Sequence, residues 1–158
     1  MHSITSEQFE TLKKNQDLCK AYPPVTEYAV FQIDKLKELI KFVEESPQFK
    51  AEDAHNFSYQ VAVYLVREEL INKESKVLFP DVSYETKEQL SVHSQNIGDN
   101  HYTQVIPIIV GCVATTPKDG DKIIRNCKPI TDMVGNIKVV TSGGEGTGII
   151  PPPPKTKG

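Results

Sequence analysis

Apolar side chains recur at the helical period in two segments of the first half of the chain. Thr5 can cap the first helix, with Gln8 three residues later completing a capping box, and an apolar stripe then runs from Phe9 to Cys19. Two prolines follow soon after Lys20. Because proline and the residue before it resist the helical conformation, we expect this helix to end near Lys20.

A second helix is expected after Asp34, which would act as its cap, and the Ser46-Pro47 step would end it. Before this helix, the bulky side chains of residues 26–33 predict a strand. The apolar positions of the helix follow the i, i+3, i+4, i+7 pattern of a helix with one buried face, and they are Leu36, Leu39, Ile40 and Val43.

Two apolar segments predict the main strands of a sheet. Residues 57–67 carry bulky apolar side chains at both alternating sets of positions, so we expect a central strand that is covered on both faces. Residues 103–116 form the most apolar segment of the chain. Pro107 and Gly111 interrupt this segment and favour an edge position, a bulge or a bend.

Shorter elements complete the predicted sheet. Residues 117–120 have the composition of a turn, after which residues 121–126 would return as the second arm of a hairpin. Residues 136–141 predict a last short strand, residues 77–79 are a candidate edge strand, and residues 86–90 are a candidate helical turn. The predicted fold class is α+β, with two helices from the N-terminal half packed on a mainly antiparallel sheet.

The composition changes along the chain in the same sense. All 8 leucines lie at or before Leu90, and Glu145 is the single glutamate after Glu88. Leu and Glu favour helices, whereas the Ile and Val of the second half favour strands. We expect one α+β domain over residues 1–141, followed over residues 142–158 by a glycine-rich hinge and a proline-rich tail.

Charge and hydropathy argue against two classes of partner. The chain has 18 Lys and Arg against 21 Asp and Glu, a net charge of -3, so it lacks the concentrated positive charge that nucleic-acid binding requires. No apolar run approaches the roughly 18 residues that cross a bilayer. The N-terminus also lacks the basic region and apolar core of a secretory signal. We therefore expect neither a nucleic-acid nor a membrane partner.

The three cysteines are Cys19, Cys112 and Cys127, an odd number without C-x-x-C spacing. This usage is typical of a reducing compartment and favours a cytoplasmic location. Cys19 falls in the first helix and Cys112 in the most apolar strand, which predicts small buried side chains. A disulfide between Cys112 and Cys127 is the alternative if the protein is exported by a route without a cleaved signal.

The densest group of reactive side chains precedes the most apolar strand. His93, Asp99 and His101 include the ligand types of a zinc or other transition-metal site, and Cys112 is a candidate nucleophile beside either histidine. We prefer to interpret this segment as a polar loop in which Asp99 makes turn hydrogen bonds and the histidines are exposed. An apolar strand would also bury Cys112 and raise the pKa of its thiol. A small metal-dependent or thiol hydrolase is therefore the second hypothesis, and no cofactor is expected.

The C-terminal tail is a candidate protein-binding segment. The glycine-rich stretch before it lacks the lysine and the following helix of a phosphate-binding loop, so we interpret it as a linker. Four successive prolines then predict a stiff polyproline II segment, the kind that docks in aromatic grooves. The alternative is a solubilising terminus. The candidate partner-binding residues are Ile149, Ile150, Pro151, Pro152, Pro153, Pro154 and Lys155.

These observations favour a non-enzymatic protein-binding or assembly module over an enzyme. Such an accessory protein would contact a protein partner, or a second copy of itself, through a sheet edge, through the tail, or through both. The strand that Pro107 interrupts is the expected edge.

Overall fold

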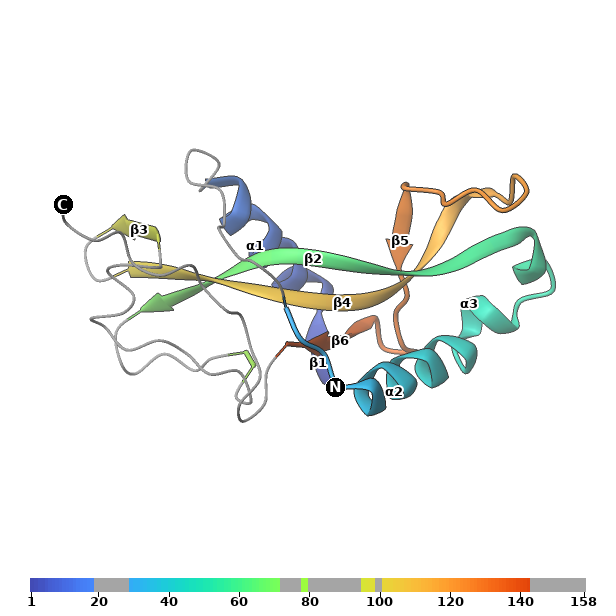
Figure 1. Ribbon diagram of the computed structural model, residues 1–158, viewed down its shortest axis with the longest axis horizontal. Coiled ribbons are helices and arrows are strands. Elements are labelled where there is room, and N and C mark those ends of the chain that lie inside the picture. Colours follow the sequence, from blue (N-terminus) through green and yellow to red (C-terminus); the bar gives the residue numbers. More distant parts are fainter. Residues whose placement is uncertain (19–28, 72–77, 80–94, 99–100, 143–158) are drawn as a thin grey trace. The chain divides into compact units, whose positions relative to one another are not determined.

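The computed structural model describes residues 1–18, 29–71, 78–79, 95–98 and 101–142 of the chain (Figure 1). These residues form an α+β fold whose sheet is mainly antiparallel, as the sequence predicted. The described helices are α1 (Ser6–Leu18), α2 (Ile33–Glu44), α3 (Pro47–Lys50) and the short 3-10 helix η1 (Ala54–Asn56). The described strands are β1 (His2–Thr5), β2 (Phe57–Ile71), β3 (Gln95–Gly98), β4 (His101–Pro117), β5 (Cys127–Pro129) and β6 (Asn136–Thr141).

The described strands pair in the order β1-β6-β4-β2, and β3 and β5 also pair with β4. Strand β1 is antiparallel to β6, with His2 opposite Val139 and Thr5 opposite Asn136. Strand β6 has the bounds that the sequence predicted, whereas β1 was not predicted. Ile4 is the only buried residue among its four, and one buried position is too short a pattern to indicate a strand from the sequence.

The chain divides into two compact units. Unit 1 comprises Met1–Phe9, Gln32–Tyr64 and Ile108–Val140, and unit 2 comprises Glu10–Phe31, Leu65–Pro107 and Thr141–Gly158. The predicted boundary between a folded domain and a tail falls where the described residues end, so it stays a prediction. Helix α2, helix α3, the disulfide partners and residues 57–64 of β2 all belong to unit 1.

Unit 2 contains buried polar groups that are satisfied within it. The Asn15 side chain is buried and donates from Nδ2 to the Arg67 carbonyl oxygen at 3.1 Å. The Glu68 carboxylate, 4% exposed, accepts a hydrogen bond from the backbone N–H of Leu78. Such bonds offset the cost of removing polar groups from water.

Leu78 and the buried Phe79 form no strand, so the edge strand predicted over residues 77–79 is wrong in its described part.

The capping box at the start of α1 is confirmed. The Gln8 N–H donates to Thr5 Oγ1 at 3.0 Å, and the Thr5 N–H donates to Gln8 Oε1 at 2.9 Å. Ile4 and Phe9 on either side of the cap are both buried. The predicted end of this helix near Lys20 lies outside the described residues, which reach Leu18.

Helix α2 is confirmed, but its predicted start is wrong. It begins at Ile33 after an extended Gln32, so Asp34 lies in the first turn, where its charge favours the positive end of the helix dipole. The strand predicted over residues 26–33 is also wrong over residues 30–33, since residues 30–32 have no regular structure and Ile33 is helical, and a single β-bridge at residue 29 is the strand-like feature of its described part. The helix begins one residue before Asp34 and therefore takes Ile33, the last residue that was assigned to that strand.

Strand β4 was expected at an edge, and the structure corrects this expectation. It lies between β6 and β2, and every residue from 105 to 112 is buried. A strand with apolar side chains on both faces is stabilised when both faces are covered. This burial decides the position of β4 in the sheet, although Pro107 and Gly111 interrupt the run. Gly111 has a packing role, because a Cβ atom added there would overlap Cγ2 of Val43 on α2.

Strand β2 was expected at the centre of the sheet, covered on both faces, and this prediction is also wrong. It is the last strand in the described order, and Val61, Val63 and Leu65 are 56%, 59% and 43% exposed.

The turn predicted after β4 is present at Gly120, which has a φ of 61° that favours glycine. The returning strand, however, is β5, beginning at Cys127 rather than at residue 121.

Candidate functional site

The structure describes few of the residues that the sequence singled out. His93, Asp99 and the tail residues 149–155 lie outside the described part of the chain, and His101 begins β4 with its side chain undescribed. Convergence of the two imidazoles with Asp99 therefore stays an untested alternative to the polar loop. Within the described ranges, no group of three or more His, Cys, Asp or Glu side chains could hold a metal ion.

Cys112 is buried in β4, as its apolar strand predicted, and it forms a disulfide with Cys127 of β5. The two Cα atoms are 5.6 Å apart, within the usual range for a disulfide. In the register of the two strands, Ala114 lies opposite Cys127 and Cys112 lies opposite Pro129, so the cysteines are diagonal neighbours. The Cys112 sulfur is not a thiolate while the bridge is intact, and nucleophilic chemistry there would first require reduction.

The disulfide has one polar neighbour from β2. Gln60 Nε2 lies 3.9 Å from Cys127 Sγ and donates to the carbonyl oxygen of Ile124 at 2.8 Å. The Ile124 N–H donates back to Gln60 Oε1 at 3.2 Å. The Gln60 carboxamide therefore anchors the segment that precedes β5 to β2. The disulfide attaches the neighbouring residue Cys127 to β4.

These contacts identify the two faces of the sheet in unit 1. Gly111 of β4 faces α2, whereas its neighbour Cys112 faces the disulfide. Alternate residues of a strand point to opposite faces. On β2, Gln60 points to the disulfide face, so Tyr59, Val61 and Val63 point to the face that carries α2 and α3, which gives the helix face its name. Tyr64 shares the face of Gln60, and its ring contacts Phe9 of α1, with 5.2 Å between the centroids. We refer to these as the disulfide face and the helix face.

Contacts between Tyr59 and α3 agree with the assignment of Tyr59 to the helix face. Its ring contacts that of Phe49 edge to face, with 4.9 Å between the centroids, and its hydroxyl donates to the carbonyl oxygen of Gln48 at 2.7 Å. Burial, and secondarily the negative charge of Asp53, raise the pKa of Tyr59 above its ordinary value of 10.0. The hydroxyl therefore remains a protonated donor at neutral pH. This end of β2 is covered by α3.

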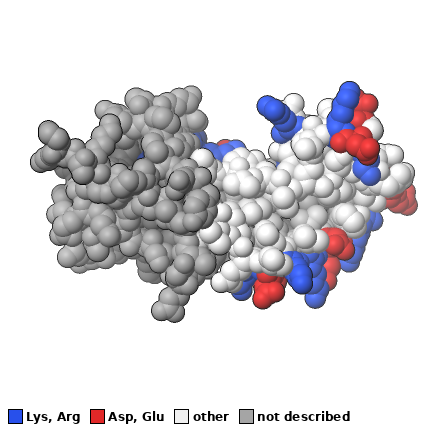
Figure 2. All heavy atoms as spheres, viewed as in Figure 1, with Lys and Arg blue, Asp and Glu red and all other residues white. Residues whose placement is uncertain are grey.

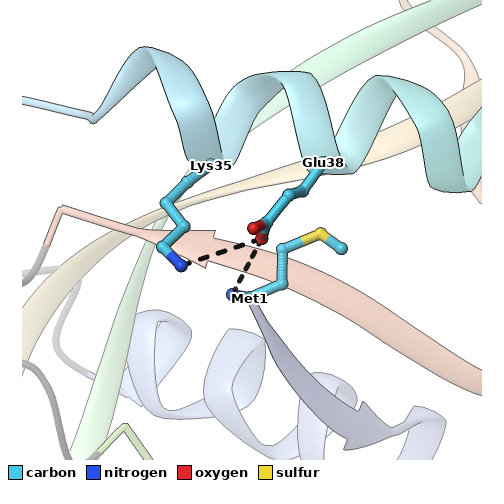
Figure 3. Close-up of polar contacts among 3 residues, drawn as sticks. All are labelled: Met1, Lys35 and Glu38. Carbon is cyan, nitrogen blue, oxygen red and sulfur yellow. Dashed lines mark ion pairs between the residues drawn. The ribbon is translucent and has the colours of Figure 1, made fainter.

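The orientation of α2 follows from an ion pair on one of its flanks (Figure 3). The α-amino group of Met1 lies 3.7 Å from Glu38 Oε2, and Lys35 Nζ lies 3.8 Å from the same oxygen. Met1 precedes β1, which stands at the opposite end of the strand order from β2. The Glu38 flank of α2 therefore faces the β1 side of the sheet.

The opposite flank of α2 is apolar and exposed. Ile40 lies about 160° around the helix from Glu38, and Ile33 lies two turns before Ile40 on the same side. Ile33 is 69% exposed and Ile40 49% exposed, whereas Leu39 and Val43 are buried. Because the Glu38 flank faces β1, this apolar flank turns away from β1, toward the side of the sheet where β2 lies.

Together, the exposed apolar residues on the helix face form what we name the α2–β2 surface. Figure 2 shows charged side chains along α2 and around the loop before β5, with uncharged residues over the region between them. The sequence predicted Ile40, Val61 and Val63 as apolar positions but assigned all three to the core. The α2–β2 surface consists of Ile33, Ile40, Phe49, Val61 and Val63.

Among the described residues, no helix combines the length and the apolar character that crossing a bilayer demands. Comparison of the chain with protein-family models, with curated proteins and with solved structures finds no match in any of the three.

Proposed function

We propose that the protein is a non-enzymatic binding or assembly module that contacts a protein partner through the α2–β2 surface. The observation that carries this proposal is the row of Val61 and Val63 on β2, both more than half exposed in the middle of a long strand. Contiguous exposed apolar residues mark interaction sites more often than isolated ones do.

The sequence of β2 supports the same conclusion. Natural proteins protect a free edge strand with charged residues, proline, bulges or a covering element. Residues 57–66 of β2 contain no charged residue, no proline and no glycine. A last strand with this composition favours association, so we propose that β2 is covered when the protein acts.

The proline-rich tail is the second proposed contact. Residues 149–155 lie outside the described part of the chain, and their four successive prolines favour a polyproline II segment of the kind that docks in aromatic grooves. The two contacts can be separated experimentally, because the tail is removable without altering any residue of the α2–β2 surface.

The disulfide bears on where this module works. A cytoplasmic location was predicted from the cysteine count, but stable disulfides are rare in reducing compartments and common in oxidising ones. The Cys112–Cys127 bridge therefore favours an oxidising compartment over the cytoplasm. Trapping thiols in intact host cells with a maleimide tests this: one alkylated cysteine of the 3 in the denatured chain supports oxidation, and three support the cytoplasm.

Affinity capture with the full chain tests the proposed function. Val61→Thr/Val63→Thr makes two side chains of the surface polar while keeping their β-branched shape and strand propensity. The matched control is Val134→Thr, the same change at a site that is 79% exposed in the turn before β6. We expect the double variant to lose a stoichiometric protein contact, to this chain or to another, that the control retains. Deletion of residues 149–158 measures the share of the tail.

Two outcomes would overturn the proposed function. One is that the wild-type chain forms no stoichiometric contact with itself or with another protein. The other is that neither the double variant nor the tail deletion weakens the contact that it forms.

A further inference from the structure

We infer that the partner of the α2–β2 surface is a second copy of this chain, bound about a two-fold axis that passes close to Ile40. This inference rests on the proposed function and adds the identity of the partner. Three observations carry it: the charges beside Ile40, the shape of the surface, and its area.

The charges beside Ile40 are self-complementary. Lys37 and Glu44 lie two turns apart on the side of α2 that carries Ile40, and both are exposed. Neither makes an ion pair with another described residue, in contrast to Lys35 and Glu38 on the opposite flank. Two unpaired charges of opposite sign thus bracket the exposed apolar position.

A two-fold axis that passes near Ile40, perpendicular to α2, places α2 antiparallel to its copy. This arrangement places Lys37 of one copy opposite Glu44 of the other, and by symmetry the pair forms twice. A parallel arrangement would instead place Lys37 near Lys37 and Glu44 near Glu44, which is repulsive. The charge order along α2 therefore selects one orientation of one partner.

The shape of the surface also fits a copy of itself. Helix α2 stands on the sheet over Gly111 of β4, and the adjacent strand β2 presents Val61 and Val63 without a helix over them. The surface therefore has a raised half, formed by α2, and a bare half, formed by the uncovered part of β2. In the two-fold arrangement, the α2 helix of each copy covers the bare strand of the other, and Ile40 packs on its symmetry mate.

The area matches that of a specific dimer. Five side chains that are 40% to 69% exposed present on the order of 400 Å² of apolar surface, within the range of functional patches. Interfaces are roughly 60% apolar, so the complete interface with its charged rim is about 670 Å² per copy. The total is close to roughly 1,300 Å², inside the standard class and at its lower end. We therefore expect a reversible dimer that dissociates on dilution.

Sedimentation of the full chain over a concentration series tests the inference with a charge exchange. Lys37→Glu places two carboxylates opposite each other across the two-fold axis, and Glu44→Lys places two ammonium groups opposite each other. Each single variant should raise the dimer dissociation constant at least about ten-fold. The double exchange Lys37→Glu/Glu44→Lys restores opposite charges and should return the constant to within about three-fold of the wild type.

The control is Lys118→Glu, an exposed charge reversal in the loop after β4 that changes the net charge by the same amount as Lys37→Glu. It should leave the dissociation constant unchanged, and circular dichroism should show every variant folded. A dimer that the single exchanges do not weaken, or that the double exchange does not restore, overturns the inference.

A chain that remains monomeric at all concentrations also overturns the inference. If such a monomer still captures a different protein through Val61 and Val63, the proposed function stands and only the identity of the partner is wrong. If it captures nothing, the proposed function falls as well.

Discussion

Strands β2 and β4 are the two long strands of the described sheet, and both are rich in apolar side chains, but their environments differ. In β4, all residues from 105 to 112 are buried although Pro107 and Gly111 interrupt them. In β2, nothing interrupts residues 57–66, yet Val61 and Val63 are more than half exposed. The difference comes from neighbours: β4 lies between two strands under α2, whereas β2 is last in the order. Apolar residues on a last strand remain available to a partner.

The largest expected effect is on the connection between β4 and β5. Removal of the disulfide by Cys112→Ala/Cys127→Ala should lower the free energy of unfolding by about 3 kcal/mol, because the bridge constrains a loop between residues 15 apart in the unfolded chain. Gln60→Ala removes the corresponding connection from β2 and should cost about 1 kcal/mol. Urea unfolding without reductant measures both. Equal losses would show that β4 is not the more strongly anchored strand.

The second prediction compares one substitution in both strands. Val110→Thr places a hydroxyl at a fully buried site of β4 and should cost about 2 kcal/mol. Val63→Thr makes the same change at an exposed site of β2 and should alter stability by less than about 0.5 kcal/mol. Chemical unfolding of the dilute proteins provides the measurement. A large loss at Val63 would contradict the exposed position of that side chain.

The third prediction concerns the close approach of α2 to β4. Gly111→Ala should cost about 1.5 kcal/mol, because the new Cβ atom would overlap Cγ2 of Val43, a stiff β-branched side chain. Val43→Ala removes that atom, so the double variant should lose less stability than the two single variants added together. Additive losses in a double-mutant cycle would argue against this contact.

The fourth prediction concerns the covered end of β2. Tyr59→Phe removes the hydrogen bond to Gln48 and should cost about 1 kcal/mol near neutral pH. Burial raises the pKa of Tyr59 above 10.0, so the folded state holds the proton more tightly than the unfolded state does. This contribution is complete below about pH 10 and is lost as the pH rises through the folded-state pKa.

The measurement for Tyr59 is therefore the stability of wild type and Tyr59→Phe from neutral to alkaline pH. The difference between the two proteins should shrink above about pH 10. A difference that stays constant through this range would contradict the role of burial at Tyr59.

Features that depend on neighbouring residues were predictable from the sequence. The capping box of Thr5 and Gln8 joins residues three apart, and the bounds of β6 follow from a local run of strand-forming residues. The buried positions Leu39 and Val43 of α2 were also predicted, because their spacing is fixed by helical geometry, whereas Ile40 of the same pattern is exposed. Each of these features is decided within one element.

Features that depend on pairing across the chain were not predictable in the same way. Pro107 and Gly111 were interpreted as signs of an edge position, a bulge or a bend, but Gly111 makes room for Val43, a residue far away in the sequence. The pairing of Cys112 with Cys127 depends on the register of β4 and β5, so it stayed an alternative. The α2–β2 surface was missed for the same reason: the apolar pattern of Val61 and Val63 is visible in the sequence, but what covers them is not.

The most direct test of the account is the solvent exposure of individual valine methyl groups, measured by NMR with a soluble paramagnetic probe. In dilute protein, the probe should broaden the methyl signals of Val61 and Val63 and spare that of Val110. In concentrated protein, or with the partner bound, Val61 and Val63 should become protected while Val134 stays accessible. If Val61 and Val63 are protected like Val110 in dilute protein, or remain accessible in every assembly the chain forms, the central claim is contradicted.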